Sequence, residues 1–111
     1  LFRSSGALAA APGLHGVTAG ARDLVRRPML AEELKKTDVA VFDPPRAGAA
    51  EQTAELARSS VARVIGVSCN PATFARDART LIDAGYGLDR VLPVDQFLWS
   101  PHIELVGVFS R

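Results

Sequence analysis

The segment VARVIGVSCNPATFARD, residues Val61 to Asp77, joins an apolar β-branched run to the start of a helix. The run Val61–Val67 is typical of a buried strand, and it indicates a central strand of a parallel sheet covered on both faces. From Ala72 to Ala84 apolar residues recur at i, i+4, i+7 and i+8, the spacing of one helical face. They are Phe74, Ala78, Leu81 and Ile82.

The ends of this helix are marked by residues that suit helix termini. Asn70 is a good N-cap, and Pro71 fits the first helical position because its missing amide hydrogen would have no partner there. Gly85 suits the C-terminal cap. Cys69 therefore lies between a strand and a capped helix, where the unpaired amides and the helix dipole favour a negatively charged side chain.

Strand-like and helical segments alternate along the rest of the chain. The run Asp38–Phe42 is ended by DPPRAG, because its prolines and glycine interrupt a strand, and a helix follows over about Ala49–Ser59. Strand-like runs at Leu88–Phe97 and His102–Ser110 have a short connection that favours an antiparallel hairpin. The first third predicts a helix near Ser5–Ala11, a strand near His15–Thr18 and a helix near Pro28–Leu34.

This order predicts the α/β class, with a mostly parallel sheet and an antiparallel edge strand. The chain has 111 residues, of which 48% are hydrophobic and 23% charged, which is typical of a single globular domain spanning 1–111. Its net charge of +1 gives no general electrostatic attraction to nucleic acid, so any RNA contact must come from a local site.

The single cysteine excludes an internal disulfide and a cysteine-only metal cluster. It also fits a reducing compartment, for which the cytoplasm is the default expectation. The opening residues lack an apolar run that could span a bilayer, so we expect no membrane partner, and we expect neither a DNA partner nor a bound metal.

Four chemically active side chains are expected to converge at one edge of the sheet. Asp43 and Cys69 each follow a parallel strand, and the carboxyl ends of such strands form the ligand-binding edge of open α/β folds. The returning strand of the hairpin starts at this edge with His102 and Glu104, and Glu104 shares a side of that strand with Val106.

Structural interpretations of the same residues remain open at this point. A lone cysteine is often simply buried, a glutamate in a terminal strand often faces solvent, and Asp43 could be a turn residue. Arg76 and Asp77 are interpreted as solvated helix charges rather than RNA contacts.

Several motifs occur together in a fixed order: FDPPRAGA (Phe42–Ala49), VSCNPATFARD (Val67–Asp77), AGY (Ala84–Tyr86), PVDQF (Pro93–Phe97) and SPHIELVGVFSR (Ser100–Arg111). They closely resemble the C-terminal catalytic region of the S-adenosylmethionine-dependent RNA 5-methyluridine methyltransferases, which methylate uracil C5 in tRNA or 23S rRNA. The resemblance is clearest after Asp38, and it implies a Rossmann-like methyltransferase fold with an antiparallel last strand.

The resemblance also implies residue roles. Cys69 matches the nucleophile, Glu104 the base and Asp43 a carboxylate of the cofactor site, while Asp23 in ARDL matches the residue that meets the adenine of S-adenosylmethionine. Arg46 and His102 are candidates for contacts with the RNA substrate.

The family also has a strand, a glycine-bearing loop and an acidic residue that are not found upstream of Asp23. We therefore expect an N-terminally truncated catalytic domain that is inactive alone and able to self-associate. Two alternatives stay open: a noncatalytic α/β fragment, and a thiol-based hydrolase or redox enzyme, the second weakened by the lack of a resolving cysteine.

Overall fold

A computed structural model describes residues 16, 18–95 and 103–111. Its elements are β1 (Val39–Phe42), α2 (Ala50–Arg58), β2 (Arg63–Ser68), α3 (Pro71–Asp83), β3 (Gly87–Asp95) and β4 (Ile103–Ser110). The helix expected near residues 5–11 lies outside the described part of the chain. Of the strand expected over 15–18, only residues 16 and 18 are described, and neither is in a strand.

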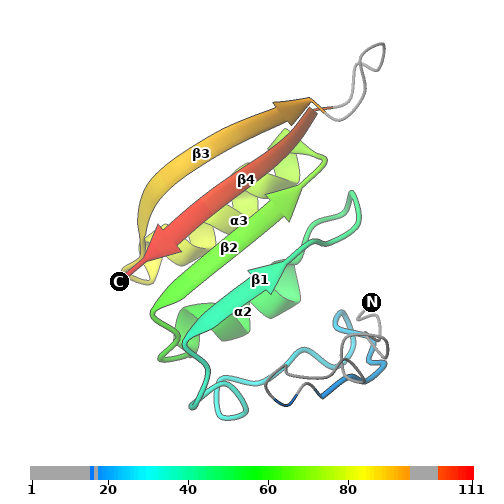
Figure 1. The fold of residues 1–111 in the computed structure, drawn as a ribbon, viewed down its shortest axis with the longest axis vertical. Coiled ribbons are helices and arrows are strands. Elements are labelled where there is room, and N and C mark those ends of the chain that lie inside the picture. The colour runs from blue at the N-terminus through cyan, green and yellow to red at the C-terminus, as the bar shows by residue number, and fades with distance from the viewer. Residues whose placement is uncertain (1–15, 17, 96–102) are drawn as a thin grey trace.

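The four strands form one mixed sheet in the order β1-β2-β4-β3 (Figure 1). β1 and β2 are parallel, whereas β4 is antiparallel to both β2 and β3. β1, β2 and β3 therefore run in one direction and β4 runs in the other, as the hairpin predicted.

The position of the antiparallel strand in the sheet differs from the sequence prediction, because β4 lies inside the sheet and not at its edge. β4 is rich in apolar residues, such as Leu105 and Val106, and in the interior of the sheet both of its backbone edges are paired, with β2 and with β3. β3 contains Pro93, which lacks an amide hydrogen, and charged residues such as Arg90, so it suits an edge.

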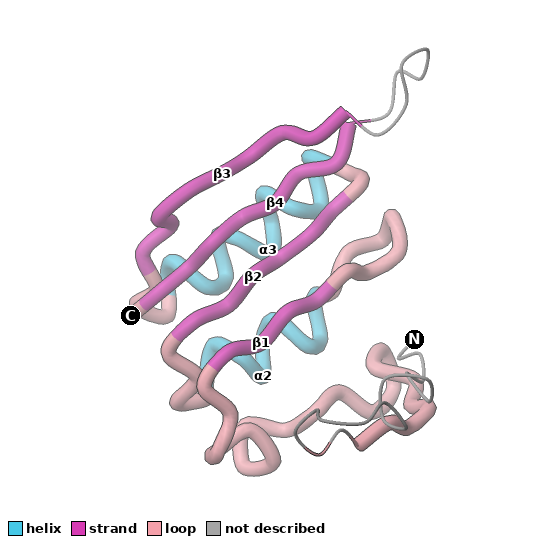
Figure 2. Tube along the Cα trace, in the orientation of Figure 1, coloured by secondary structure: helices cyan, strands magenta, loops and turns pink. Residues whose placement is uncertain are grey.

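Both helices cover the same face of the sheet (Figures 1 and 2). On that face Val64 and Phe109 pack with Leu56 of α2 and Leu81 of α3 in the core. The strand register places Val41, Ile65 and Val108 on the opposite face. Coverage of both faces was predicted, but within residues 18–95 and 103–111 the helices lie on one face only.

Two glycines in the middle of the sheet make room for aromatic rings. Gly66 and Gly107 face each other in the β2–β4 ladder. A Cβ atom on Gly66 would lie 2.8 Å from Cζ of Phe42, and one on Gly107 would lie 2.5 Å from Cζ of Phe74. The missing side chains thus let both rings lie directly against the sheet.

The structure confirms the predicted termini of α3. The Asn70 side chain accepts a hydrogen bond from the amide of Ala72, and Pro71 is the first helical residue. Gly85 follows the helix with φ of 111°, and the amide of Tyr86 donates back to the Leu81 carbonyl, which completes a Schellman motif.

The buried face of α3 differs from the predicted one at two positions. Ile82 was expected to be buried but is 37% exposed, whereas Asp77 was interpreted as solvated but is only 3% exposed. Asp77 is buried because its carboxylate has hydrogen-bond partners, among them the amide of Ala49 at the start of α2.

The predicted helix over Pro28–Leu34 is wrong, because turns occupy residues 31–36. Side chains of α2 bind the backbone of this segment: Gln52 accepts from the Met29 amide and Glu55 from the Ala31 amide. These amides are therefore bound to α2 side chains, and Leu34 reaches the core from the turn. No helix in the described residues is both long and apolar enough to cross a membrane.

Candidate functional site

Cys69 directly follows β2, and Glu104 is the second residue of the neighbouring strand β4. Ser68 pairs with Leu105 in the last step of the antiparallel ladder, so Cys69 and Glu104 take the next position on each strand. Glu104 also pairs with Val94 of β3. Cys69 is partly buried and its thiol is free.

One oxygen of the Glu104 carboxylate, Oε2, is buried without a hydrogen bond among the described residues. The register places it on the apolar face opposite the helices, beside Val106 and Val94. Buried polar atoms are nearly always paired, so the unpaired Glu104 oxygen is an exception that calls for an explanation.

Asp43 lies at the same edge of the sheet, directly after β1. Phe42 pairs with Gly66, so the Asp43 position is level with Val67, two residues before Cys69 on the neighbouring strand. Asp43 is exposed and lines a groove of about 420 Å³. The other residues that line it are Leu24, Val25, Val41, Phe42, Pro44, Pro45, Gly48, Ala49, Glu51 and Gln52.

Two features of the groove suit part of a nucleoside that carries a positive charge. Its apolar wall, which includes Leu24 and Val41, can cover a planar base, and the Asp43 carboxylate can face a positively charged sulfur. Its volume lies within the range of small-molecule sites. These residues could therefore contact the base and the charged sulfur of S-adenosylmethionine.

The structure does not place Asp23 in the wall of this groove. Its Oδ1 accepts hydrogen bonds from the amides of Val25 at 3.0 Å and Arg26 at 3.4 Å, so the side chain stabilises a local turn. The two following residues, Leu24 and Val25, line the groove instead. Their position was missed because an acidic residue in ARDL is a stronger sequence signal than its apolar neighbours.

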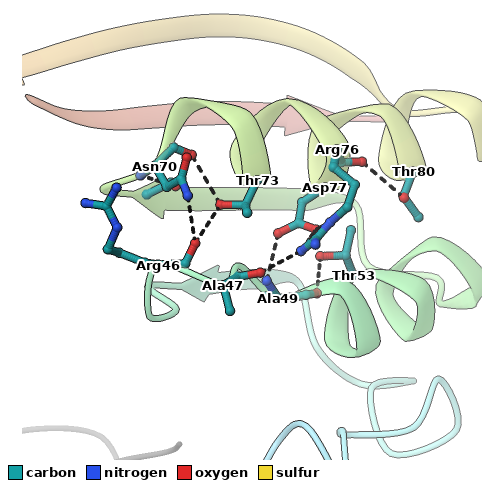
Figure 3. A network of polar contacts seen from close by, with 10 residues as sticks. Arg46, Ala47, Ala49, Thr53, Asn70, Thr73, Arg76, Asp77 and Thr80 are labelled. Atoms are coloured by element: carbon teal, nitrogen blue, oxygen red, sulfur yellow. Dashed lines mark hydrogen bonds and ion pairs between the residues drawn. The ribbon is translucent and has the colours of Figure 1, made fainter.

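Of the two predicted substrate contacts, Arg46 and His102, the structure describes only Arg46. His102 lies outside the described residues. Arg46 is exposed, and its guanidinium has no hydrogen bond within the described part of the chain, while its backbone carbonyl accepts from Asn70 Nδ2 at 3.1 Å and Thr73 Oγ1 at 3.0 Å (Figure 3). The loop that carries Asp43 and Arg46 is thereby attached to the start of α3, next to Cys69.

Arg76 and Asp77 extend this attachment, and sequence reasoning missed both. Arg76 and Asp77 follow Thr73 by three and four residues and so lie on the same side of α3. This spacing is the sequence signal that could have predicted their shared contact with the loop. Among residues 18–95 and 103–111, no group of three or more His, Cys, Asp or Glu side chains could hold a metal ion.

The sequence pattern of the tRNA (uracil-5-)-methyltransferase family matches residues 11–111. The chain belongs to this family. It is similar to an uncharacterised RNA methyltransferase of Caulobacter vibrioides, with 72% identity over 105 residues, which is 95% of this chain and 25% of the relative. It is also 42% identical to the 23S rRNA (uracil(1939)-C(5))-methyltransferase of Erwinia tasmaniensis, over 80% of this chain and 20% of that enzyme.

A solved structure is similar as well, that of the Pyrococcus abyssi tRNA (uracil-54, C5)-methyltransferase in complex with S-adenosyl-L-homocysteine. The TM-score is 0.61 with 39% sequence identity, and the match covers 68% of this chain and 19% of that protein. The chain thus spans about a quarter or less of the length of these family members.

Proposed function

We propose that this chain provides the catalytic residues of an enzyme that transfers a methyl group to C5 of a uridine in RNA, either tRNA or 23S rRNA. The β2–β4 register carries the proposal, because its last pair, Ser68 with Leu105, lies one step before Cys69 and Glu104. Family membership and relatives named as RNA uracil methyltransferases support the reaction class. The same proposal makes residues 1–111 the C-terminal part of a Rossmann-like methyltransferase domain. It also places the enzyme in the cytoplasm.

The thiol is needed because uracil C5 is a weak nucleophile. The Cys69 thiolate adds to C6, and the electron pair of the C5–C6 double bond moves into an enolate that is nucleophilic at C5. After C5 has gained the methyl group, Glu104 removes the proton from C5. The electron pair of that C–H bond restores the double bond, and the thiolate leaves C6.

S-adenosylmethionine, when bound, supplies the electrophilic methyl group on a positively charged sulfur. Asp43 is the residue in the groove that would lie near this charge. Leu24 and Val25, which follow Asp23 in the chain and line the groove, would contact the adenine together with Asp23. Arg46 has a free guanidinium within the described residues and is the candidate for an RNA phosphate or the base. The target uridine must be unstacked to reach the thiol, which favours a loop or a flipped base.

The test uses the complete protein encoded by the gene, S-adenosylmethionine and RNA that contains 5-fluorouridine. Fluorine at C5 cannot be removed as a proton, so a covalent protein–RNA complex should accumulate. Cys69→Ala should abolish the complex, whereas Glu104→Gln should retain it. On ordinary RNA labelled with tritium at C5, Glu104→Gln should lower tritium release by about 10²–10⁴-fold, the usual contribution of a general base. A complex formed by Cys69→Ala, or unchanged tritium release by Glu104→Gln, contradicts the assignments.

We expect the isolated 111-residue chain to be inactive. We also expect it to associate with a second copy of itself. The resemblance assigns the methionine and ribose contacts of the cofactor to residues upstream of Asp23. Among the described strands β1 pairs only with β2, and Val39 and Val41 of β1 are 47% and 65% exposed. An exposed apolar edge strand favours pairing with another chain.

A further inference from the structure

Side chains of α3 hold the backbone of the loop that follows β1 (Figure 3). Beyond the bonds from Asn70 and Thr73 to the Arg46 carbonyl, Nη2 of Arg76 donates to the Ala47 carbonyl at 2.9 Å. The loop is thus bound by the N-cap and one side of α3, which begins two residues after Cys69. We call Asn70, Thr73, Arg76 and Asp77 the loop clamp.

Asp77 is the buried member of the loop clamp. Its Oδ2 accepts from the Ala49 amide at 2.8 Å, and its Oδ1 accepts from Nε and Nη2 of Arg76 at 3.2 and 3.1 Å. Ala49 is the N-cap residue of α2 and its side chain cannot cap the helix. The carboxylate of α3 therefore provides negative charge at the N-terminus of α2, where the helix dipole favours it, and Arg76 balances that charge.

The loop itself is shaped to fit the clamp. Gly48 has φ of 84°, a left-handed conformation that favours glycine, and its amide donates to the Pro45 carbonyl. A Cβ atom on Gly48 would lie 2.5 Å from Nη2 of Arg76 and 2.9 Å from Oδ2 of Asp77. The loop and α3 therefore meet without space for one more carbon atom.

We propose that Asp77 is a positioning residue for methyl transfer and acts together with Arg76. Asp43 and Arg46 are in the clamped loop, and Cys69 lies two residues before the first residue of the helix that carries the clamp. The clamp therefore sets the position of the cofactor-facing carboxylate relative to the nucleophile, although Asp77 lies outside the groove. This inference rests on the function proposed above. A displacement of about 1 Å between reacting groups can lower a rate about 10²-fold.

The complete protein tests this role through Asp77→Asn, with Asp83→Asn as the matched control. Asparagine keeps the shape of the side chain but replaces one carboxylate oxygen with an NH₂ group. It therefore cannot accept at both positions where Ala49 and Arg76 donate. Asp83 is on the same helix and makes only an exposed ion pair with Arg79. Asp77→Asn should lower kcat, measured with RNA and S-adenosylmethionine both saturating, about 10–100-fold, and it should speed hydrogen exchange at the Ala49 amide. Asp83→Asn should change neither.

Arg76 provides a second test. Because 48% of its side chain is exposed, replacing it should disturb the fold less than replacing the buried Asp77. Arg76→Ala should lower kcat measured with both substrates saturating, and Arg76→Lys, which keeps the charge and a donor for Ala47, should restore most of it. If exchange at Ala49 rises while kcat is unchanged, or if Arg76→Ala lowers only thermal stability, the positioning role is wrong and uracil methylation stands. If the wild-type protein forms no adduct and methylates no RNA, the proposed function fails and the positioning role fails with it.

Discussion

We expect Gly107→Ala to destabilise the protein by overpacking the centre of the sheet. The new Cβ would lie 2.5 and 2.8 Å from Cζ and Cε2 of Phe74 and 3.2 Å from Cε1 of Phe109. Normal carbon contacts are about 3.5–4.0 Å, so the Phe74 ring must move by about 1 Å. It cannot do so freely, because its centroid lies 6.3 Å from that of Phe109 in a tilted aromatic pair.

Overpacking of this kind costs about 1–3 kcal/mol. Replacing glycine within a strand returns about 0.5–1 kcal/mol, so the mid-values predict that the free energy of unfolding falls by about 1 kcal/mol. Urea denaturation of the chain, followed by circular dichroism, measures this change. Gly87→Ala is the control, since the nearest atom to its Cβ is the Ser110 carbonyl oxygen at an ordinary 3.7 Å.

Phe74→Leu supplies the decisive comparison because it removes the ring that the new methyl group meets. In a double-mutant cycle, Gly107→Ala should cost at least about 0.5 kcal/mol less in the Phe74→Leu background, within the range of coupling between contacting residues. Equal cost in both backgrounds, or a Gly107→Ala protein as stable as the wild type, would refute the packing argument.

Three further outcomes are expected. Tyr86→Phe should lower the free energy of unfolding by about 1–3 kcal/mol in urea denaturation, because the buried Val61 carbonyl loses a hydrogen bond; no loss would mean that water replaces the hydroxyl. Glu33 should titrate by NMR with a pKa lowered to about 2, because the hydrogen bond from Arg22 favours its charged form. Its stabilising contribution is therefore complete above the ordinary carboxyl pKa, near 4.3, and is lost as the pH falls towards about 2; Arg22→Ala should return this pKa towards the ordinary value. In sedimentation experiments, Val41→Lys should shift the isolated chain towards monomer, and an unchanged distribution would argue against association through β1.

Local sequence signals predicted α3 well because its ends depend on neighbouring residues. Asn70 and Pro71 stabilise the N-terminus and Gly85 the C-terminus whatever surrounds the helix. The prediction for Pro28–Leu34 failed for the opposite reason. The backbone amides of Met29 and Ala31 bind side chains of α2, more than twenty residues away, and a local pattern contains no information about such partners.

The sequence by itself determined the class of fold, the direction of each strand and the edge of the sheet where Asp43, Cys69 and Glu104 come together. Strand ends and the short hairpin settle these features, since parallel strands joined by crossover helices must end at the same edge. Only the tertiary structure decided that β4 lies between β2 and β3, and that Asp77 is buried against the loop after β1. Both depend on contacts between residues far apart in the chain, where burial and hydrogen bonding outweigh the local preference of an acidic side chain for water.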